Sequence, residues 1–91
     1  MTVIETPLTI INELGLHARA AAKFVTVAGG YASDIKLARG ERRVDGKSIM
    51  GVMLLAAPKG TELTLTATGE DADAAVEALL ALVADYFGEG K

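Results

Sequence analysis

The chain has 91 residues, which predicts a single domain spanning residues 1–91. Apolar residues make up 51% of it and charged residues 23%, proportions typical of a globular and not a disordered chain. The net charge of −3 argues against a nucleic-acid-binding protein, and the absence of cysteine excludes disulfides and thiol chemistry. No signal-peptide pattern and no apolar run of about 18 residues is present, so we expect a cytoplasmic monomer without membrane insertion.

The first third of the chain predicts a strand followed by a helix. Residues 2–11, TVIETPLTII, are rich in β-branched side chains and predict the strand. Pro7 cannot donate a hydrogen bond to a neighbouring strand, so this strand should lie at a sheet edge or contain a bulge. Residues 18–28 predict the helix, because Ala21, Phe24 and the apolar residues after them recur at helical spacing. A pair of glycines then ends it.

The middle of the chain predicts a hairpin and a short helix. Residues 31–45 contain two segments of alternating apolar and polar residues around Gly40, the pattern of a β-hairpin. Residues 48–55, SIMGVMLL, fit the helix and strand patterns about equally well. We predict a helix, because Ser48 is a favourable N-cap residue.

The last third contains the clearest strand and the clearest helix. Residues 61–69 alternate threonine with leucine and alanine, which predicts a half-buried strand. Residues 71–87 predict a helix with Asp71 and Asp73 in its first turn and Gly88 at its end. The order β-α-β-β-α-β-α predicts an α+β fold. Its economical arrangement is an open-faced two-layer β-sandwich, a four-stranded antiparallel sheet with three helices on one face.

Several kinds of chemical site do not fit this sequence. One histidine without any cysteine excludes most zinc sites, and we expect neither a metal nor a cofactor. Ser48 is one residue out of position for the Gly-x-Ser-x-Gly elbow of serine hydrolases. Residues 40–48, GERRVDGKS, resemble a phosphate-binding loop, but five residues separate the two glycines where that motif has four.

The only histidine, His17, stands where the first helix begins. The first turn of a helix carries unpaired N–H groups and partial positive charge, so it attracts phosphate and favours an uncharged imidazole. A phosphoryl group on His17 would meet the backbone N–H groups of Ala18 and Arg19 and the Arg19 guanidinium. Side chains two residues apart do not face each other within a helix, so His17 must lie at or before the N-cap. The alternative is a capping or surface histidine beside an unrelated arginine.

A second informative segment is DGKSIMGVM, residues 45–53. Ile49, Met50 and Met53 cannot all face inward from so short a helix, so some of them should form an exposed apolar patch suited to protein partners. A phosphate on Ser48 would be accommodated at the helix N-terminus and would place about two negative charges in that patch. The simpler alternative is that Ser48 only caps the helix.

Together the two segments resemble the HPr family of the bacterial phosphoenolpyruvate-dependent phosphotransferase system. GLHARAAAKFV, residues 15–25, resembles the family's Gly-[Leu/Ile]-His-x-Arg-Pro motif at the start of the first helix. KSIMGVM, residues 47–53, resembles its regulatory serine motif, and the order and spacing match over essentially the whole chain. Ala20 stands where many members have proline, a residue with a preset φ and no N–H.

The resemblance implies a phosphocarrier protein and not an enzyme. His17 would accept a phosphoryl group from enzyme I on Nδ1 and pass it to IIA proteins or domains, for sugar uptake or for regulation of the nitrogen-related branch. Arg19 would help to hold this group, and Ser48 would be a target of the HPr kinase/phosphorylase. The partner-binding surface implied by the resemblance consists of Leu16, Ile49, Met50 and Met53.

Two other functions stay open from the sequence. A small-ligand regulatory module would have a concave pocket and carry no acid-labile phosphate. A family member that acts only through Ser48 would bind its target without His17. Glu13 is the acidic residue closest to His17 in the sequence. The sequence places no obvious base beside His17 that could activate water.

Overall fold

The sheet of the protein has four strands, all of them antiparallel. A computed structural model describes residues 1–91. The strands are β1 (Thr2–Thr9), β2 (Asp34–Arg39), β3 (Arg42–Asp45) and β4 (Glu62–Gly69), in the order β1-β4-β2-β3. The edge position predicted from Pro7 is confirmed, because β1 pairs only with β4 and Pro7 lies opposite Thr64 in an unbroken register. The predicted hairpin is also confirmed, as β2 and β3 are joined through Gly40 and Glu41.

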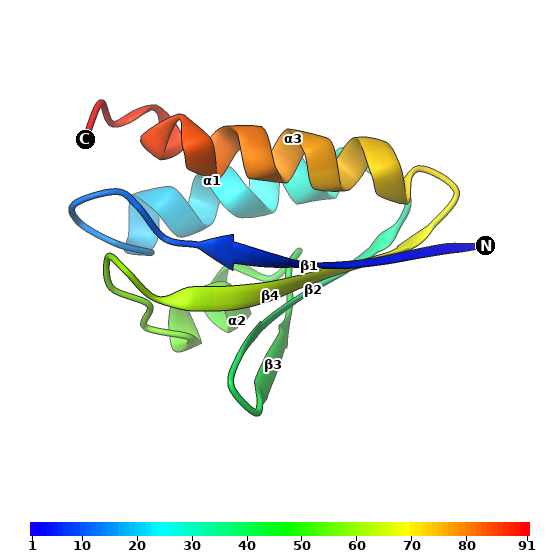
Figure 1. Ribbon diagram of the computed structural model, residues 1–91, viewed down its shortest axis with the longest axis horizontal. Coiled ribbons are helices and arrows are strands. Elements are labelled where there is room, and N and C mark those ends of the chain that lie inside the picture. Colours follow the sequence, from blue (N-terminus) through cyan, green and yellow to red (C-terminus); the bar gives the residue numbers. More distant parts are fainter.

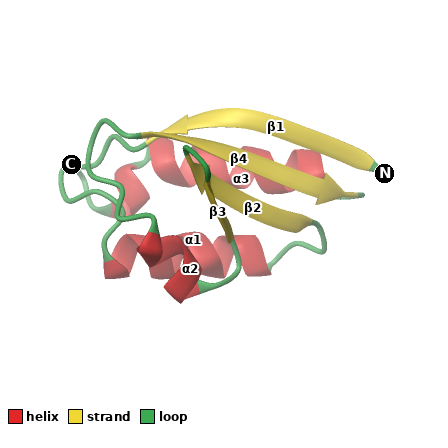
Figure 2. Cartoon of the chain, turned by 90° about the horizontal axis from the view of Figure 1, so that it is seen from below, coloured by secondary structure: helices red, strands yellow, loops and turns green.

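Three helices complete the order β-α-β-β-α-β-α, as the sequence predicts. They are α1 (Ala18–Gly29), α2 (Ile49–Leu54) and α3 (Ala72–Ala84). Figure 1 shows α1 and α3 side by side along the sheet, and Figure 2 shows the strands as one layer with the helices behind and below it. The core lies between these layers, where Ile35, Leu37 and Leu65 of the sheet and Phe24 and Leu79 of the helices are fully buried. No helix has the length and hydropathy needed to span a bilayer.

The last predicted helix is shorter than expected. The sequence predicts a helix through residue 87, but α3 ends at Ala84 and a short 3₁₀ segment, η1 (Tyr86–Gly88), follows. Tyr86 and Phe87 have φ values of 56° and 54°, in the left-handed region that side chains other than glycine rarely adopt. This turn buries Phe87 completely. It also places the C-terminal residues at the end of the molecule that carries the loop between β1 and α1, as Figure 1 shows.

A polar contact joins the start of α3 to the segment before β2. The Asp71 carboxylate accepts hydrogen bonds from the backbone N–H groups of Ala32 (2.8 Å) and Ser33 (2.9 Å) and from the Ser33 hydroxyl. The Ser33 hydroxyl above all, and then the Ala32 N–H, lower the pKa of Asp71 against the opposing effect of burial. Asp71 was expected in the first helical turn but occupies the N-cap position, where its side chain makes no capping bond.

Candidate functional site

His17 is the N-cap residue of α1, as its role at the helix start requires. Its backbone is extended, with φ −78° and ψ −178°, and its Nδ1 accepts a hydrogen bond from the backbone N–H of Arg19 at 3.3 Å. The side chain is 29% exposed, so the ring is neither buried in the core nor free in solvent. Placement before the first helical residue removes the geometric objection that side chains two apart cannot meet within a helix.

The N-terminus of α1 offers backbone donors around the imidazole. The first bond within the helix runs from the Ala21 N–H to the His17 carbonyl, at 2.8 Å. The N–H groups of Ala18 and Ala20 have no hydrogen-bond partner in the protein, and the Arg19 guanidinium makes neither a hydrogen bond nor an ion pair. Ala18 and Arg19 are exposed, so their groups are available to an anion in front of Nδ1, a position that helix termini favour electrostatically, whereas Ala20 is fully buried.

The other ring nitrogen of His17 contacts a carboxylate from the far end of the chain. Glu89 Oε2 lies 2.5 Å from His17 Nε2, and Glu89 Oε1 accepts a hydrogen bond from Asn12 Nδ2 at 2.9 Å. Burial leaves the Glu89 side chain only 9% exposed and by itself raises its pKa. The hydrogen bonds from Asn12 and His17, with the positive charge of Lys23, outweigh burial and lower the pKa of Glu89 below its ordinary 4.5.

These contacts select one tautomer of His17. A backbone N–H can only donate, so Nδ1 must be the acceptor in its contact with Arg19 and cannot carry a proton there. The ring proton is then on Nε2, where it is donated to the Glu89 carboxylate. The arrangement therefore leaves the lone pair of Nδ1 directed at the backbone donors of the helix start. An unprotonated imidazole nitrogen in this position can act as a nucleophile.

The carboxylate at His17 was missed from the sequence. Glu13, the nearest acidic residue in the chain, instead pairs with Lys91 at 3.7 Å on the exposed surface. The position of Glu89 depends on left-handed backbone conformations at Tyr86 and Phe87. Tyrosine and phenylalanine rarely adopt this conformation, so the sequence does not predict a turn there. Only the glycines that flank Glu89 pointed to irregular backbone in this region.

The loop before His17 is held by buried contacts. Asn12 is fully buried, and its Nδ2 also donates to the Gly15 carbonyl at 2.8 Å, so one amide joins the loop to Glu89. Gly15 has φ 72°, and a Cβ there would lie 2.7 Å from the Ala57 carbonyl oxygen. A residue without a side chain is therefore needed at Gly15, where the chain turns into the helix.

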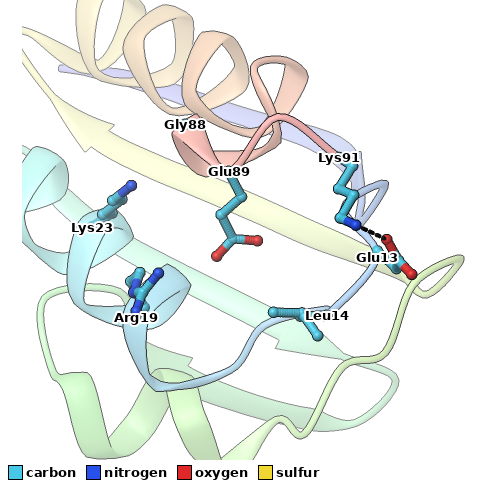
Figure 3. Close-up of a pocket in the computed structure, with 7 residues that line it drawn as sticks. All are labelled: Glu13, Leu14, Arg19, Lys23, Gly88, Glu89 and Lys91. Carbon is cyan, nitrogen blue, oxygen red and sulfur yellow. Dashed lines mark ion pairs between the residues drawn. The ribbon is translucent and has the colours of Figure 1, made fainter.

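A cavity of about 400 Å³ lies beside the Glu89 carboxylate. Figure 3 shows Arg19 and Lys23 projecting from α1 on one side of it, with Glu89 between them and the Lys91–Glu13 pair. Lys23 is also bound to the C-terminal segment, because its Nζ donates to the Phe87 carbonyl at 2.6 Å. The surroundings of His17 are therefore rich in positive charge, with Glu89 as the one carboxylate that contacts the ring.

The second predicted segment forms the short helix α2, which packs beside α1. Ser48 is its N-cap, and the Ser48 hydroxyl accepts a hydrogen bond from the Gly51 N–H at 3.2 Å. Ile49, Met50 and Met53 are exposed, as the patch prediction requires. Leu16 is different: only 5% of it is exposed and it belongs to the core, so the expectation that it forms part of an exposed docking surface is wrong.

Comparison with known proteins decides the family. Residues 4–85 match the family described as the PTS HPr component phosphorylation site. The chain belongs to the HPr family of the phosphotransferase system. HPr-family membership makes it a phosphocarrier, a component that transfers a group and is not itself an enzyme, as the two sequence motifs predicted.

Individual HPr relatives match over nearly their whole length. The phosphocarrier protein HPr of Cupriavidus necator is 53% identical over 89 residues, covering 98% of this chain and all of the relative. HPr of Pseudomonas aeruginosa is 58% identical over 85 residues, covering 92% and 94% of the two chains. The crystal structure of HPr-C-His from Thermoanaerobacter tengcongensis superposes with a TM-score of 0.91 at 41% identity, over 94% of this chain and 97% of that one. This likeness confirms the predicted HPr-like fold.

Proposed function

We propose that His17 is the residue that carries the phosphoryl group, and that it does so on Nδ1. The observation that supports this most directly is the pair of contacts on the ring, with Nε2 bound to Glu89 and Nδ1 facing the start of α1. In the transfer step the Nδ1 lone pair forms the new N–P bond while the bond from phosphorus to the donor breaks. No proton has to leave Nδ1, and the Glu89 carboxylate stabilises the positive charge that develops on the imidazole.

The N-terminus of α1 holds the bound phosphoryl group in this proposal. Its oxygens replace Nδ1 as acceptor for the Arg19 N–H and accept from the free N–H group of Ala18. The unpaired Arg19 guanidinium adds charge-assisted hydrogen bonds.

Partners dock on the exposed apolar patch of α2 in this proposal. The patch consists of Ile49, Met50 and Met53, whose side chains are exposed next to α1. Enzyme I is the donor, and IIA proteins or domains of a sugar or nitrogen-related branch are the acceptors. The chain acts as a single domain and a monomer in the cytoplasm, and its partners supply the remaining catalytic groups.

Ser48 is proposed as a regulatory phosphorylation site for an HPr kinase/phosphorylase. Its hydroxyl already lies at the N-terminus of α2, where a phosphate would accept from the Gly51 N–H in the same way. About two added negative charges beside Ile49 would weaken apolar docking. The modification would therefore inhibit transfer without unfolding the protein.

Intact-mass measurement tests the proposal. After incubation with phosphoenolpyruvate and enzyme I, the protein should gain one phosphate that mild acid removes, and His17→Ala should gain none. A phosphate that survives acid and is lost in Ser48→Ala would favour the Ser48-only alternative. No adduct together with saturable binding of a metabolite would favour a small-ligand module.

A further inference from the structure

The turn that follows α2 has an unfavourable backbone conformation. Helix α2 ends at Leu54 with Leu55 as C-cap, and Ala56, the next residue, has φ 46°. This is the left-handed region, which an alanine adopts at a cost because its Cβ crowds the following carbonyl. A conformation of this kind persists only where surrounding contacts hold it.

Two arginines of the β2–β3 hairpin hold this turn. Nη1 of Arg39, the last residue of β2, donates to the Leu55 carbonyl at 3.0 Å and to the Ala56 carbonyl at 2.9 Å. The guanidinium thus binds the carbonyls on both sides of the left-handed residue. Arg42, at the start of β3, adds a longer bond of 3.4 Å to the Leu54 carbonyl.

The same turn supports the residues around the phosphorylation site. The Ala57 carbonyl accepts a hydrogen bond from the Leu16 N–H at 2.8 Å, one residue before His17. A hollow of about 260 Å³ lies beside the imidazole, and residues 56–58 line it together with Leu14, Leu16 and His17. A displacement at Ala56 would therefore change both the support of the His17 loop and the surface next to the ring.

We propose that Arg39 is a positioning residue for phosphoryl transfer. It holds Ala56 in its left-handed conformation, and through the Ala57–Leu16 hydrogen bond it fixes the loop that presents His17. This inference rests on the proposed role of His17. Arg39 makes no contact with the imidazole, so it acts through the turn and not on the phosphoryl group.

The experiment compares four proteins: wild type, Arg39→Ala, Arg43→Ala and the double variant Arg39→Ala/Ala56→Gly. Arg43 is the matched control, because it is an exposed arginine of the same hairpin whose side chain makes no hydrogen bond or ion pair. The Ala56→Gly change removes the Cβ crowding, so the turn keeps its conformation without Arg39. Thermal melting first establishes that all four are folded at the assay temperature.

Two readouts separate positioning from global stability. Arg39→Ala should speed hydrogen exchange of the Leu16 amide about fivefold, the effect of losing one net hydrogen bond. The Ala21 amide, bonded to the His17 carbonyl within α1, should be unaffected. The KM of enzyme I for the carrier should rise by a similar factor of about five. The double variant should recover both values to within about twofold, and Arg43→Ala should match wild type.

Other outcomes overturn the inference. Equal KM and equal Leu16 exchange in Arg39→Ala and Arg43→Ala, with wild type phosphorylated normally, would refute the role of Arg39 and leave that of His17 intact. If Arg39→Ala is defective and the added Ala56→Gly change does not rescue it, the positioning role of Arg39 is also refuted and the role of His17 is left intact. If wild type itself acquires no acid-labile phosphate on His17, the proposed function fails and the positioning role fails with it.

Discussion

Glu89 contacts His17 across 72 residues of sequence, with 2.5 Å between the Glu89 Oε2 and His17 Nε2 atoms. The contact depends on the turn at Tyr86–Gly88, which directs the C-terminal residues to the N-terminus of α1. The bond from Lys23 to the Phe87 carbonyl keeps this segment in place. As a consequence the ring proton lies on the Glu89 side and the opposite nitrogen faces the unpaired helix amides.

Removal of the Glu89 carboxylate should slow phosphorylation without unfolding the protein. In Glu89→Ala the Nε2–H group loses its acceptor and no carboxylate stabilises positive charge on the ring. We therefore expect transfer from enzyme I to fall about tenfold, the range for one charge-assisted hydrogen bond. Single-turnover transfer rates measure the effect. Glu13→Ala is the control, since Glu13 only pairs with Lys91 at the surface. Equal rates in the two variants would show that the contact with Glu89 does not assist transfer.

The variant Ala20→Pro should be tolerated. It introduces the proline that many HPr proteins have at this position. The Ala20 N–H has no partner in the protein, so a proline there breaks no intrahelical bond and restricts the unfolded chain. We expect Ala20→Pro to raise the free energy of unfolding by about 0.4–1 kcal/mol, measured by denaturant titration. Ala22→Pro, deeper in α1, should instead destabilise by about 3 kcal/mol. Loss of stability in Ala20→Pro comparable to that control would show that the first turn is more constrained than the hydrogen bonds indicate.

A charge in the apolar patch of α2 should weaken docking. Met50 is 67% exposed, so Met50→Glu should leave the melting temperature nearly unchanged and raise the KM of enzyme I about tenfold, as for an interface residue worth somewhat more than 1 kcal/mol. Val3→Glu on the edge strand β1 is the control, because Val3 is 64% exposed and lies outside α2. Steady-state kinetics with both variants decide the matter. An unchanged KM in Met50→Glu would place the docking surface elsewhere.

Acid stability should depend on Asp71. The pKa of Asp71 is lowered below its ordinary 3.8 in the folded protein, so the folded state favours the carboxylate. Its stabilising contribution is therefore complete well above pH 3.8 and is lost as the pH falls through the folded pKa. Asp71→Asn should melt below wild type at pH 7, and the difference should shrink on acidification below pH 4. A difference in melting temperature that stays constant from pH 7 to pH 2 would contradict this account.

Most of the fold could be predicted from local sequence, because its pattern is regular. The threonine alternation of β4, the apolar spacing of α1 and the edge position of Pro7 are each determined within a few residues. The end of α3 could not be predicted, since the left-handed turn at Phe87 is imposed by burial of that ring in the core. Here tertiary packing overrides a favourable helical pattern.

The candidate site could be predicted only in part, because some of its features are local in the sequence and others depend on the tertiary fold. His17 at the N-cap, the adjacent amides and the Ser48 cap are all local features, and the structure has each of them where the sequence places it. Glu89 and Arg39 reach the site region only through the tertiary fold, so no spacing in the sequence indicates them. Leu16 was misassigned because an apolar residue beside a motif can face either the core or the surface.

The central claim is that Nδ1 of His17 is the nucleophile because Glu89 holds the proton on Nε2. Long-range ¹H–¹⁵N NMR of the imidazole, recorded before and after phosphorylation, tests it most directly. We predict the Nε2–H tautomer in the free protein and an N–P bond at Nδ1 after incubation with phosphoenolpyruvate and enzyme I. A free protein in the Nδ1–H tautomer, or a phosphoryl group on Nε2, would contradict the account.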